Sequence, residues 1–151
     1  MNARQDPEAH ALSATGLWQC AVQVAVLLAI DPTGLAGVRV RAAPGPVRDA
    51  WLELLRQLMG VRAWRRMPVN ISDERLLGGL DLSATLSAGR PVLQRGLLSE
   101  VDGGVLVLTM AERLPNETAA KLAAVIDNHY VMVARDGLHE QHATRFALVA
   151  L

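Results

Sequence analysis

The first half of the chain is organised as apolar runs separated by glycine and proline breaks. Residues 18–30 are almost uniformly apolar and predict a buried helix, which ends at Asp31 because the residue before a proline is disfavoured in the helical region. Residues 38–41 alternate valine with arginine, which indicates a short strand with one buried face. Residues 46–59 predict a second helix, and apolar positions at helical spacing give it a core-facing stripe of Trp51, Leu54, Leu55 and Leu58.

The second half centres on a strand that follows a pair of glycines. Residues 105–108 are four consecutive apolar residues after Gly103 and Gly104, a pattern typical of a strand buried on both faces in a parallel sheet. Residues 67–70 are expected to form a second strand, and residues 146–151 the closing one. Strands that alternate with helices in this way predict an α/β domain.

Two more helices are expected between and after these strands. Residues 82–88 predict a short helix that Gly89 and Pro91 interrupt, and Leu97 and Leu98 are expected to pack it onto the body of the domain. Asn116 is expected to cap a further helix that runs to about residue 127. The face that we expect this helix to turn inward carries Ala120, Ala123, Ala124 and Ile126.

The ends of the chain differ in character. Residues 1–11 are polar and are expected to be frayed, so the folded domain is expected to span residues 12–151. Residues 129–146 predict a hairpin that turns at Asp136 and Gly137, a strong two-residue turn signal.

Composition narrows the choice of class and compartment. The chain is 51% hydrophobic but only 3% aromatic, so leucine, valine and alanine must build its core, which fits a helix-rich α/β domain. Fifteen basic and fifteen acidic residues cancel, which argues against nucleic acid as a partner. The apolar runs are too short for a membrane span. The single Cys20 lies in an apolar run, and we expect a buried, inert thiol and a reducing, cytoplasmic location.

Residues 42–49 have the layout of a phosphate-binding loop, because a strand, a short Gly/Pro loop and a helix follow one another. Aligned with the pattern G-x-x-x-x-G-K-[ST], Ala42 takes the first glycine, Val47 the second, Arg48 the lysine and Asp49 the hydroxyl residue, while Gly45 is retained within the loop. An ordinary loop between a strand and a helix is the alternative.

Each departure from the pattern weakens phosphate binding for a physical reason. Val47 puts a branched side chain where the backbone must approach phosphate, and Pro46 has no N–H to donate. Asp49 places a carboxylate where phosphate charge would sit, and Arg48 keeps the positive charge on a longer, planar group. We therefore expect a degenerate loop with weak or lost nucleotide binding.

The buried strand 105–108 is followed by Thr109 and Met110. In nucleotide-hydrolysing P-loop proteins the corresponding strand ends in Asp-Glu, which holds the magnesium shell and polarises the attacking water. Neither threonine nor methionine can do that work, so no catalytic residue is expected here. His129, His139 and His142 are close in the sequence, but they lack a cysteine or carboxylate at ligand spacing, so surface histidines are favoured and no metal ligand is predicted.

Four segments of the chain resemble the AAA+ subunits of magnesium chelatase. Residues 79–89, GLDLSATLSAG, and 96–108, GLLSEVDGGVLVL, are similar to the region that leads into the Walker B strand of that family. Residues 68–81 resemble its L-P-x-x-x-(S/T)-E-D-R-x-x-G-x-x-D pattern. The family's R-D-G-x-x-x-x-H-x-x-R-F sequence is matched by Arg135, Asp136, Gly137, His142, Arg145 and Phe146.

The resemblance implies an AAA+ P-loop NTPase-like domain of three layers, with a mostly parallel central sheet, a helical insert and a β-hairpin. The sensor-1 residue and the C-terminal lid would come after Leu151. Because the Walker A lysine and hydroxyl residue and the Walker B acidic pair are all replaced, the chain resembles the AAA+ domain of the D-type subunit.

The function implied by this resemblance is that of a non-hydrolysing platform in an ATP-dependent complex, a metal–nitrogen ligase that inserts Mg²⁺ into protoporphyrin IX during (bacterio)chlorophyll biosynthesis. The implied partners are the I-type ATPase subunit, the porphyrin-binding H-type subunit and further copies of the chain in a ring. No cofactor would be bound tightly, and Mg²⁺ and ATP would act at the level of the complex. Two alternatives stay open: a weakly active ATPase of the same family, and an adaptor module unrelated to chelation.

Overall fold

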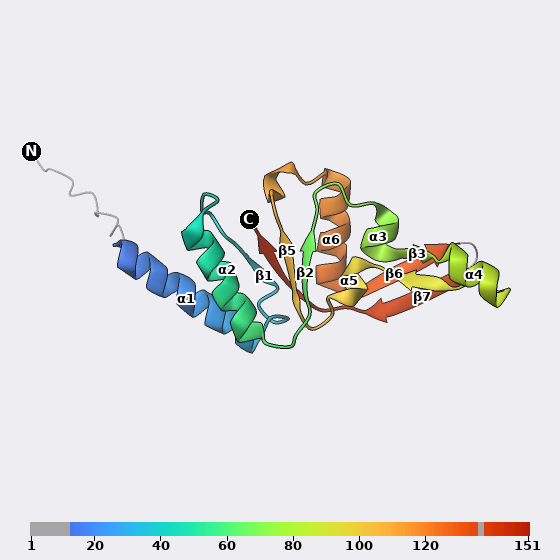
Figure 1. Cartoon of the computed structure of the whole chain (residues 1–151), viewed down its shortest axis with the longest axis horizontal. Coiled ribbons are helices and arrows are strands. Elements are labelled where there is room, and N and C mark those ends of the chain that lie inside the picture. The colour runs from blue at the N-terminus through green and yellow to red at the C-terminus, as the bar shows by residue number, and fades with distance from the viewer. Residues whose placement is uncertain (1–12, 136–137) are drawn as a thin grey trace, which may run out of the picture.

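A computed structural model describes residues 13–135 and 138–151 of the chain. Its centre is a four-stranded sheet in which every neighbouring pair is parallel, in the order β1, β8, β5, β2 (Figure 1). The strands are β1 (Gly37–Arg39), β8 (Ala147–Ala150), β5 (Val105–Leu108) and β2 (Trp64–Met67). The expected α/β fold with a mostly parallel central sheet is confirmed.

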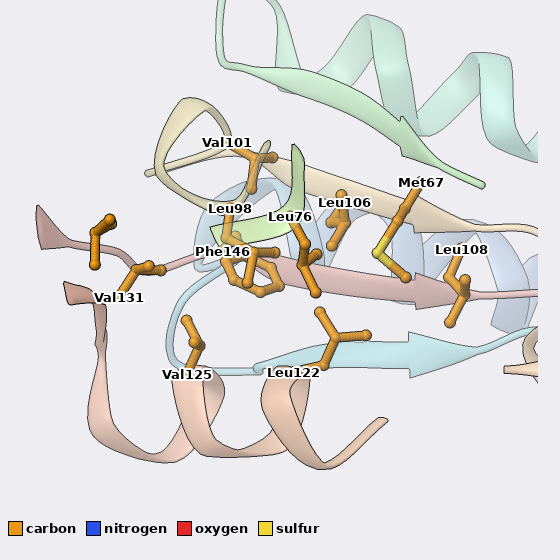
Figure 2. Packing of buried hydrophobic residues seen from close by; sticks show 11 residues of the cluster. Met67, Leu76, Leu98, Val101, Leu106, Leu108, Leu122, Val125, Val131 and Phe146 are labelled. Carbon is orange, nitrogen blue, oxygen red and sulfur yellow. The ribbon is translucent and has the colours of Figure 1, made fainter. Parts of the chain in front are cut away.

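Strand β5 is the centre of this sheet, and its side chains divide the core into two clusters. Val105 and Val107 face helices α1 (Ala14–Ile30) and α2 (Pro46–Met59). Leu106 and Leu108 face the other side, where the core includes Leu122 of α6 (Asn116–Asn128) (Figure 2). Because successive side chains of a strand point to opposite faces, an unbroken apolar run fits a strand that is covered on both sides.

Strand β2 lies three residues earlier in the sequence than we expected. The prediction placed it at residues 67–70, whereas WRRM, Trp64–Met67, forms the strand. The prediction failed because two consecutive arginines do not resemble a buried strand. They are tolerated because β2 is at the edge of the sheet, where charged side chains reach water.

Helices α2 and α6 each bury a different face from the one predicted. In α2 the buried residues are Trp51, Leu52, Leu55 and Met59. Leu54 is only partly buried, and Leu58 is 42% exposed, so its assignment to the core was wrong. The buried positions recur every three or four residues, and the face is displaced because Leu52 and Met59 reach the sheet in place of Leu58.

The face predicted for α6 was wrong for a related reason. Its buried residues are Thr118, Leu122 and Val125, whereas the alanines at 120, 123 and 124 are exposed and Ile126 is partly buried. Side chains of valine and leucine size fill the space above the sheet, which alanine cannot. Asn116 is the first helical residue and makes no capping bond, because Pro115 occupies the cap position.

Helix α1 is less buried than its apolar sequence suggested. Only Ala25 and Leu28 are fully covered, while Leu27 and Ile30 are 53% and 69% exposed. Cys20 is also exposed, so the expectation of a buried thiol was wrong. The reason is geometric: α1 contacts α2 and the sheet along one narrow face, and its N-terminal half extends past them (Figure 1).

The far end of the molecule carries the insert and the hairpin. Helix α4 (Leu82–Ala88) connects the antiparallel strands β3 (Gly78–Leu80) and β4 (Leu93–Arg95). It covers the predicted residues and ends at Gly89, as predicted, and Gly89 adopts the left-handed conformation. Strands β6 (Tyr130–Arg135) and β7 (Leu138–Ala143) form the hairpin. The predicted turn at residues 136 and 137, like the frayed segment 1–11, lies outside the described residues.

Three short helical segments complete the fold. They are α3 (Asp73–Leu77), α5 (Leu97–Glu100) and the 3-10 helix η1 (Ala111–Arg113). Leu98 of α5 is fully buried, and Leu97 packs against the same cluster, but no residue of α4 is buried or belongs to it, so the expectation that these leucines pack the insert helix onto the body was wrong. Leu76 of α3 is also fully buried there (Figure 2). These segments close the core on the face of the sheet that α6 covers.

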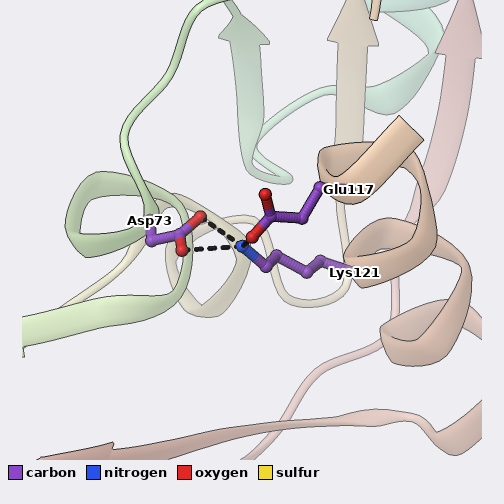
Figure 3. A network of polar contacts seen from close by, with 3 residues as sticks. All are labelled: Asp73, Glu117 and Lys121. Atoms are coloured by element: carbon purple, nitrogen blue, oxygen red, sulfur yellow. Dashed lines mark hydrogen bonds and ion pairs between the residues drawn. The ribbon is translucent and has the colours of Figure 1, made fainter. Parts of the chain in front are cut away.

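A polar network attaches α3 to α6 (Figure 3). Lys121 Nζ donates to Asp73 Oδ1 at 2.7 Å and Oδ2 at 2.6 Å, and to Glu117 Oε1 at 2.6 Å. The hydrogen bond to Asp73, followed by the one to Glu117, raises the pKa of Lys121 above its ordinary value of 10.5. The network therefore favours the folded state while Lys121 is charged.

We predict that Lys121→Met destabilises the domain at neutral pH, and that this difference disappears in alkali. A lysine pKa that is raised on folding adds stability that is complete below the unfolded value of 10.5 and is lost as the pH rises through the folded value. Lys121 is the only lysine in the chain, so no other lysine titrates in this range. Thermal unfolding of both proteins across alkaline pH is the measurement. Lys121→Arg should keep its network longer because guanidinium stays charged, and parallel curves for wild type and Lys121→Met would contradict the assignment.

Candidate functional site

The predicted phosphate-binding loop lies at the carboxyl edge of the sheet, between β1 and α2. Gly45 directly precedes α2 with φ 156° and ψ −179°, a conformation that L-residues with side chains rarely adopt. Its carbonyl accepts the N–H of Asp49 at 3.0 Å. Pro46 is the first residue of the helix. The strand, loop and helix therefore occur where the sequence predicted them.

The three side chains that replace the pattern's second glycine, lysine and hydroxyl residue differ in how far they are exposed. The side chains of Val47 and Asp49 are 67% and 68% exposed. Arg48 is only 21% exposed, and its Nε is buried without a hydrogen-bond partner, 4.0 Å from Asp49 Oδ1. Arg48 lines an apolar groove of about 510 Å³ beside Trp18 of α1 and Trp51 of α2. Its side chain is thus mostly shielded from water in that groove.

The residues that replace the Walker B carboxylates follow directly after β5. Met110 adopts the left-handed conformation with φ 57° and ψ 49° and is 47% exposed, and Thr109 is partly buried. The N–H of Ala111 donates to the carbonyl of Leu151 at 2.9 Å, which ties the end of β5 to the end of β8. Neither predicted position offers a carboxylate at this edge.

A cleft of about 500 Å³ lies at the same edge, and of the predicted site residues only Ala42 lines it. The charged groups of the cleft are Arg39, Arg41 and Glu112, none of which the sequence analysis assigned to the site. The two arginines could have been recognised, because they directly precede the loop within the alternating segment 38–41. Glu112 could have been found as the first carboxylate after the strand.

The positions that hold Mg-ATP in an intact P-loop protein carry other groups here. Phosphate binding at such a loop depends on convergent backbone N–H groups and a free ammonium, and here Pro46 has no N–H and the mostly buried Arg48 replaces the lysine. A magnesium ion needs oxygen ligands, and the positions after β5 supply one hydroxyl and one thioether. Within residues 13–135 and 138–151, no three histidine, cysteine, aspartate or glutamate side chains gather as a metal site.

The three histidines considered as metal ligands lie in the hairpin or at the end of α6 rather than at this edge. His142 Nε2 lies 3.3 Å from Glu140 Oε2 on β7, and His129 ends α6 in the left-handed conformation. The side chain of His139 is outside the described residues. In the part of the chain that the structure describes, no helix is long and apolar enough to cross a membrane.

The parallel sheet, the loop between β1 and α2, the helical insert and the hairpin define a domain of the AAA+ P-loop type. A solved structure of the complex between subunits BchI and BchD of magnesium chelatase contains a chain of the same fold, with a TM-score of 0.65 and 25% identity over 85% of this chain and 50% of that one. The magnesium-chelatase 60 kDa subunit of Cereibacter sphaeroides is 40% identical over 136 residues, 89% of this chain. The magnesium-chelatase 38 kDa subunit of Rhodobacter capsulatus is 31% identical over 83 residues, 55% of this chain.

The chain belongs to the family of the 60 kDa magnesium-chelatase subunits. It spans about a quarter of the length of these relatives, since the match covers 24% of the Cereibacter sphaeroides subunit. The similarity to the 38 kDa subunit is lower and covers a smaller part of the chain, which agrees with the expected resemblance to the D-type subunit. No protein-family model matches the chain.

Proposed function

We propose that this chain is a non-hydrolysing AAA+ platform in a magnesium chelatase. It would act in the cytoplasm and assemble with an I-type ATPase subunit, and with further copies of itself in a ring. In this proposal ATP hydrolysis on the partner drives insertion of Mg²⁺ into a porphyrin that an H-type subunit holds. The chain contributes shape and contacts rather than chemistry.

The observation that carries this proposal is the loss of three functional groups at one edge of an intact fold. The lysine is replaced by Arg48, which lines the groove beside α1. The hydroxyl residue is replaced by the exposed Asp49, and the acidic pair by Thr109 and Met110. The strand, the loop and the helix persist around these positions, so selection for the scaffold without hydrolysis explains the combination.

The family of the chain supports the choice of partner. The BchI and BchD subunits of magnesium chelatase form a complex in the solved structure that shares this fold. A platform of this kind needs no tightly bound cofactor of its own. Mg²⁺ and ATP would then act where the partner subunit holds them.

Calorimetric titration with Mg-ATP tests the proposal. We expect no binding heat from the chain alone, and tight association when a 38 kDa-type ATPase subunit is added. The ATPase subunit titrated by itself is the control that shows that the nucleotide is competent. Micromolar binding by the isolated chain, or ATP turnover, would favour a weakly active ATPase in which Glu112 supplies the missing carboxylate.

The measured association with the ATPase subunit distinguishes the platform hypothesis from the hypothesis of an adaptor that is unrelated to chelation. An adaptor would not bind the ATPase subunit, whereas a platform should bind it and raise the rate of magnesium insertion when all subunits are combined. Failure to associate with any I-type subunit would therefore remove the chelatase assignment even if the chain binds no nucleotide.

A further inference from the structure

A second cleft lies beside β2, the strand at the opposite edge of the sheet from β1. It has a volume of about 620 Å³ and is enclosed by the end of β2, the segment before α3, α3 itself, β4 and α5. None of the residues assigned to the degenerate loop lines it. The cleft is therefore independent of the nucleotide question.

The cleft is lined by three arginines and two glutamates, so positive charge is in excess. Glu100 is bonded to Arg65, with Nε 3.2 Å from Oε2, and Glu74 is also engaged in an interaction. Arg66, Arg75 and Arg95 line the same cleft from three different elements, and among residues 13–135 and 138–151 none of them has an ion pair or a side-chain hydrogen bond. Three unpaired guanidinium groups around one cavity make it a site for negative charge.

The walls between the arginines are partly apolar, with Asn70, Ser72 and Gln94 as the uncharged polar residues of the lining. Pro68, Ile71 and Leu97 line the cleft together with the charged groups. A small inorganic anion would leave these surfaces exposed to water and would fill a small part of the volume. A chain that carries carboxylates and apolar groups would cover both kinds of surface.

Strand β2 exposes backbone N–H and C=O groups next to the cleft, with which another strand could pair. Within the described residues its only partner in the sheet is β5, so the peptide groups on its outer side have no strand to pair with. An extended segment that pairs with such an edge presents every second side chain to the same face. Carboxylates at alternate positions would therefore point toward the arginines.

We propose that this cleft and the edge of β2 bind an extended, acidic segment of another protein chain. Arg66, Arg75 and Arg95 take its carboxylates, the apolar walls take the intervening side chains, and β2 gains a neighbouring strand. This surface is distinct from the platform role and adds a second contact by which the domain recognises a partner.

Fluorescence anisotropy of the full chain with a labelled peptide that alternates glutamate with valine tests the proposal. The double variant Arg75→Glu with Arg95→Glu should weaken binding by about tenfold or more. The matched control, Arg56→Glu with Arg90→Glu, makes the same change in net charge outside the cleft and should stay within about twofold of wild type. Circular dichroism establishes that both variants are folded.

Further peptides and competition with inorganic phosphate decide between the possible ligands of the cleft. A peptide that alternates lysine with valine should not bind. Peptides that are N-methylated on either the valine or the glutamate amides test the strand pairing, because only one of the two sets should face β2. Equal losses in both double variants, no binding by wild type, or complete displacement of the peptide by inorganic phosphate would each overturn the proposal.

Discussion

Replacing Gly104 by alanine is expected to lower the free energy of unfolding by about 3 kcal/mol, because the added methyl group has no room. A Cβ at this position would lie 2.0 Å from the carbonyl oxygen of Ala63 and 2.7 Å from its carbon. That carbonyl accepts the N–H of Val105 at 2.8 Å, the bond with which the pairing of β2 and β5 begins. The chain must therefore separate the two strands or break this bond.

The neighbouring glycine provides the matched control for this prediction. Gly103 has a φ of 70°, and no atom lies within 4 Å of a Cβ built on it. Gly103→Ala should cost about 1 kcal/mol, the strain of a left-handed alanine, without any steric clash. Urea unfolding of the two variants measures the difference. If Gly104→Ala costs no more than Gly103→Ala, the close approach of Ala63 does not control the stability of this turn.

The central strand could be predicted from the sequence because few structures are compatible with it. Four apolar residues after two glycines can be covered only when helices lie on both faces, and residues 105–108 are all buried. The insert helix was also predictable, since Gly89 breaks a run with no other interruption. In both cases the local pattern and the tertiary environment favour the same structure.

Features that depend on neighbours could not be predicted in this way. The edge position of β2 makes Arg65 and Arg66 acceptable in a strand, and a pattern of residues does not reveal which strand is at the edge. Likewise, the sequence of α1 is apolar all round, but its exposed side depends on how far α2 extends beside it. The faces of α2 and α6 were displaced because the spacing gives a helical period but not the depth that each side chain must fill.

In the candidate site, the positions of the loop residues could be predicted from the sequence, but the locations of side chains that depend on other elements could not. The positions of the loop residues followed from their order in the sequence, and the structure places them between β1 and α2. The location of the Arg48 guanidinium did not follow, because it depends on the groove that α1 forms with α2. Arg39, Arg41 and Glu112 share a cleft only because the ends of β1, β5 and β8 meet at one edge.

Trp51→Ala should be the most destabilising of these substitutions, with a loss of about 4 kcal/mol in the free energy of unfolding. Trp51 is 4% exposed and belongs to the cluster that joins α1 and α2 to β5 and β8. Its Nε1 donates to the carbonyl of Ala21 at 2.7 Å, so the same side chain also fixes α1 by a hydrogen bond. Removing the indole leaves a cavity directly below the groove that holds Arg48.

Two further variants separate packing from hydrogen bonding and keep the prediction testable if Trp51→Ala does not fold. Trp51→Phe retains most of the ring and loses the donor, and it should cost about 1 kcal/mol from the hydrogen bond together with a smaller packing loss. Trp18→Ala removes an indole that is 38% exposed on α1 and should cost much less than Trp51→Ala. Urea unfolding followed by circular dichroism ranks the three. If Trp18→Ala lowers the free energy of unfolding as much as Trp51→Ala does, the packing of α1 against α2 depends on the N-terminal half of α1. The prediction that Trp51 stabilises the groove beside Arg48 would then be wrong.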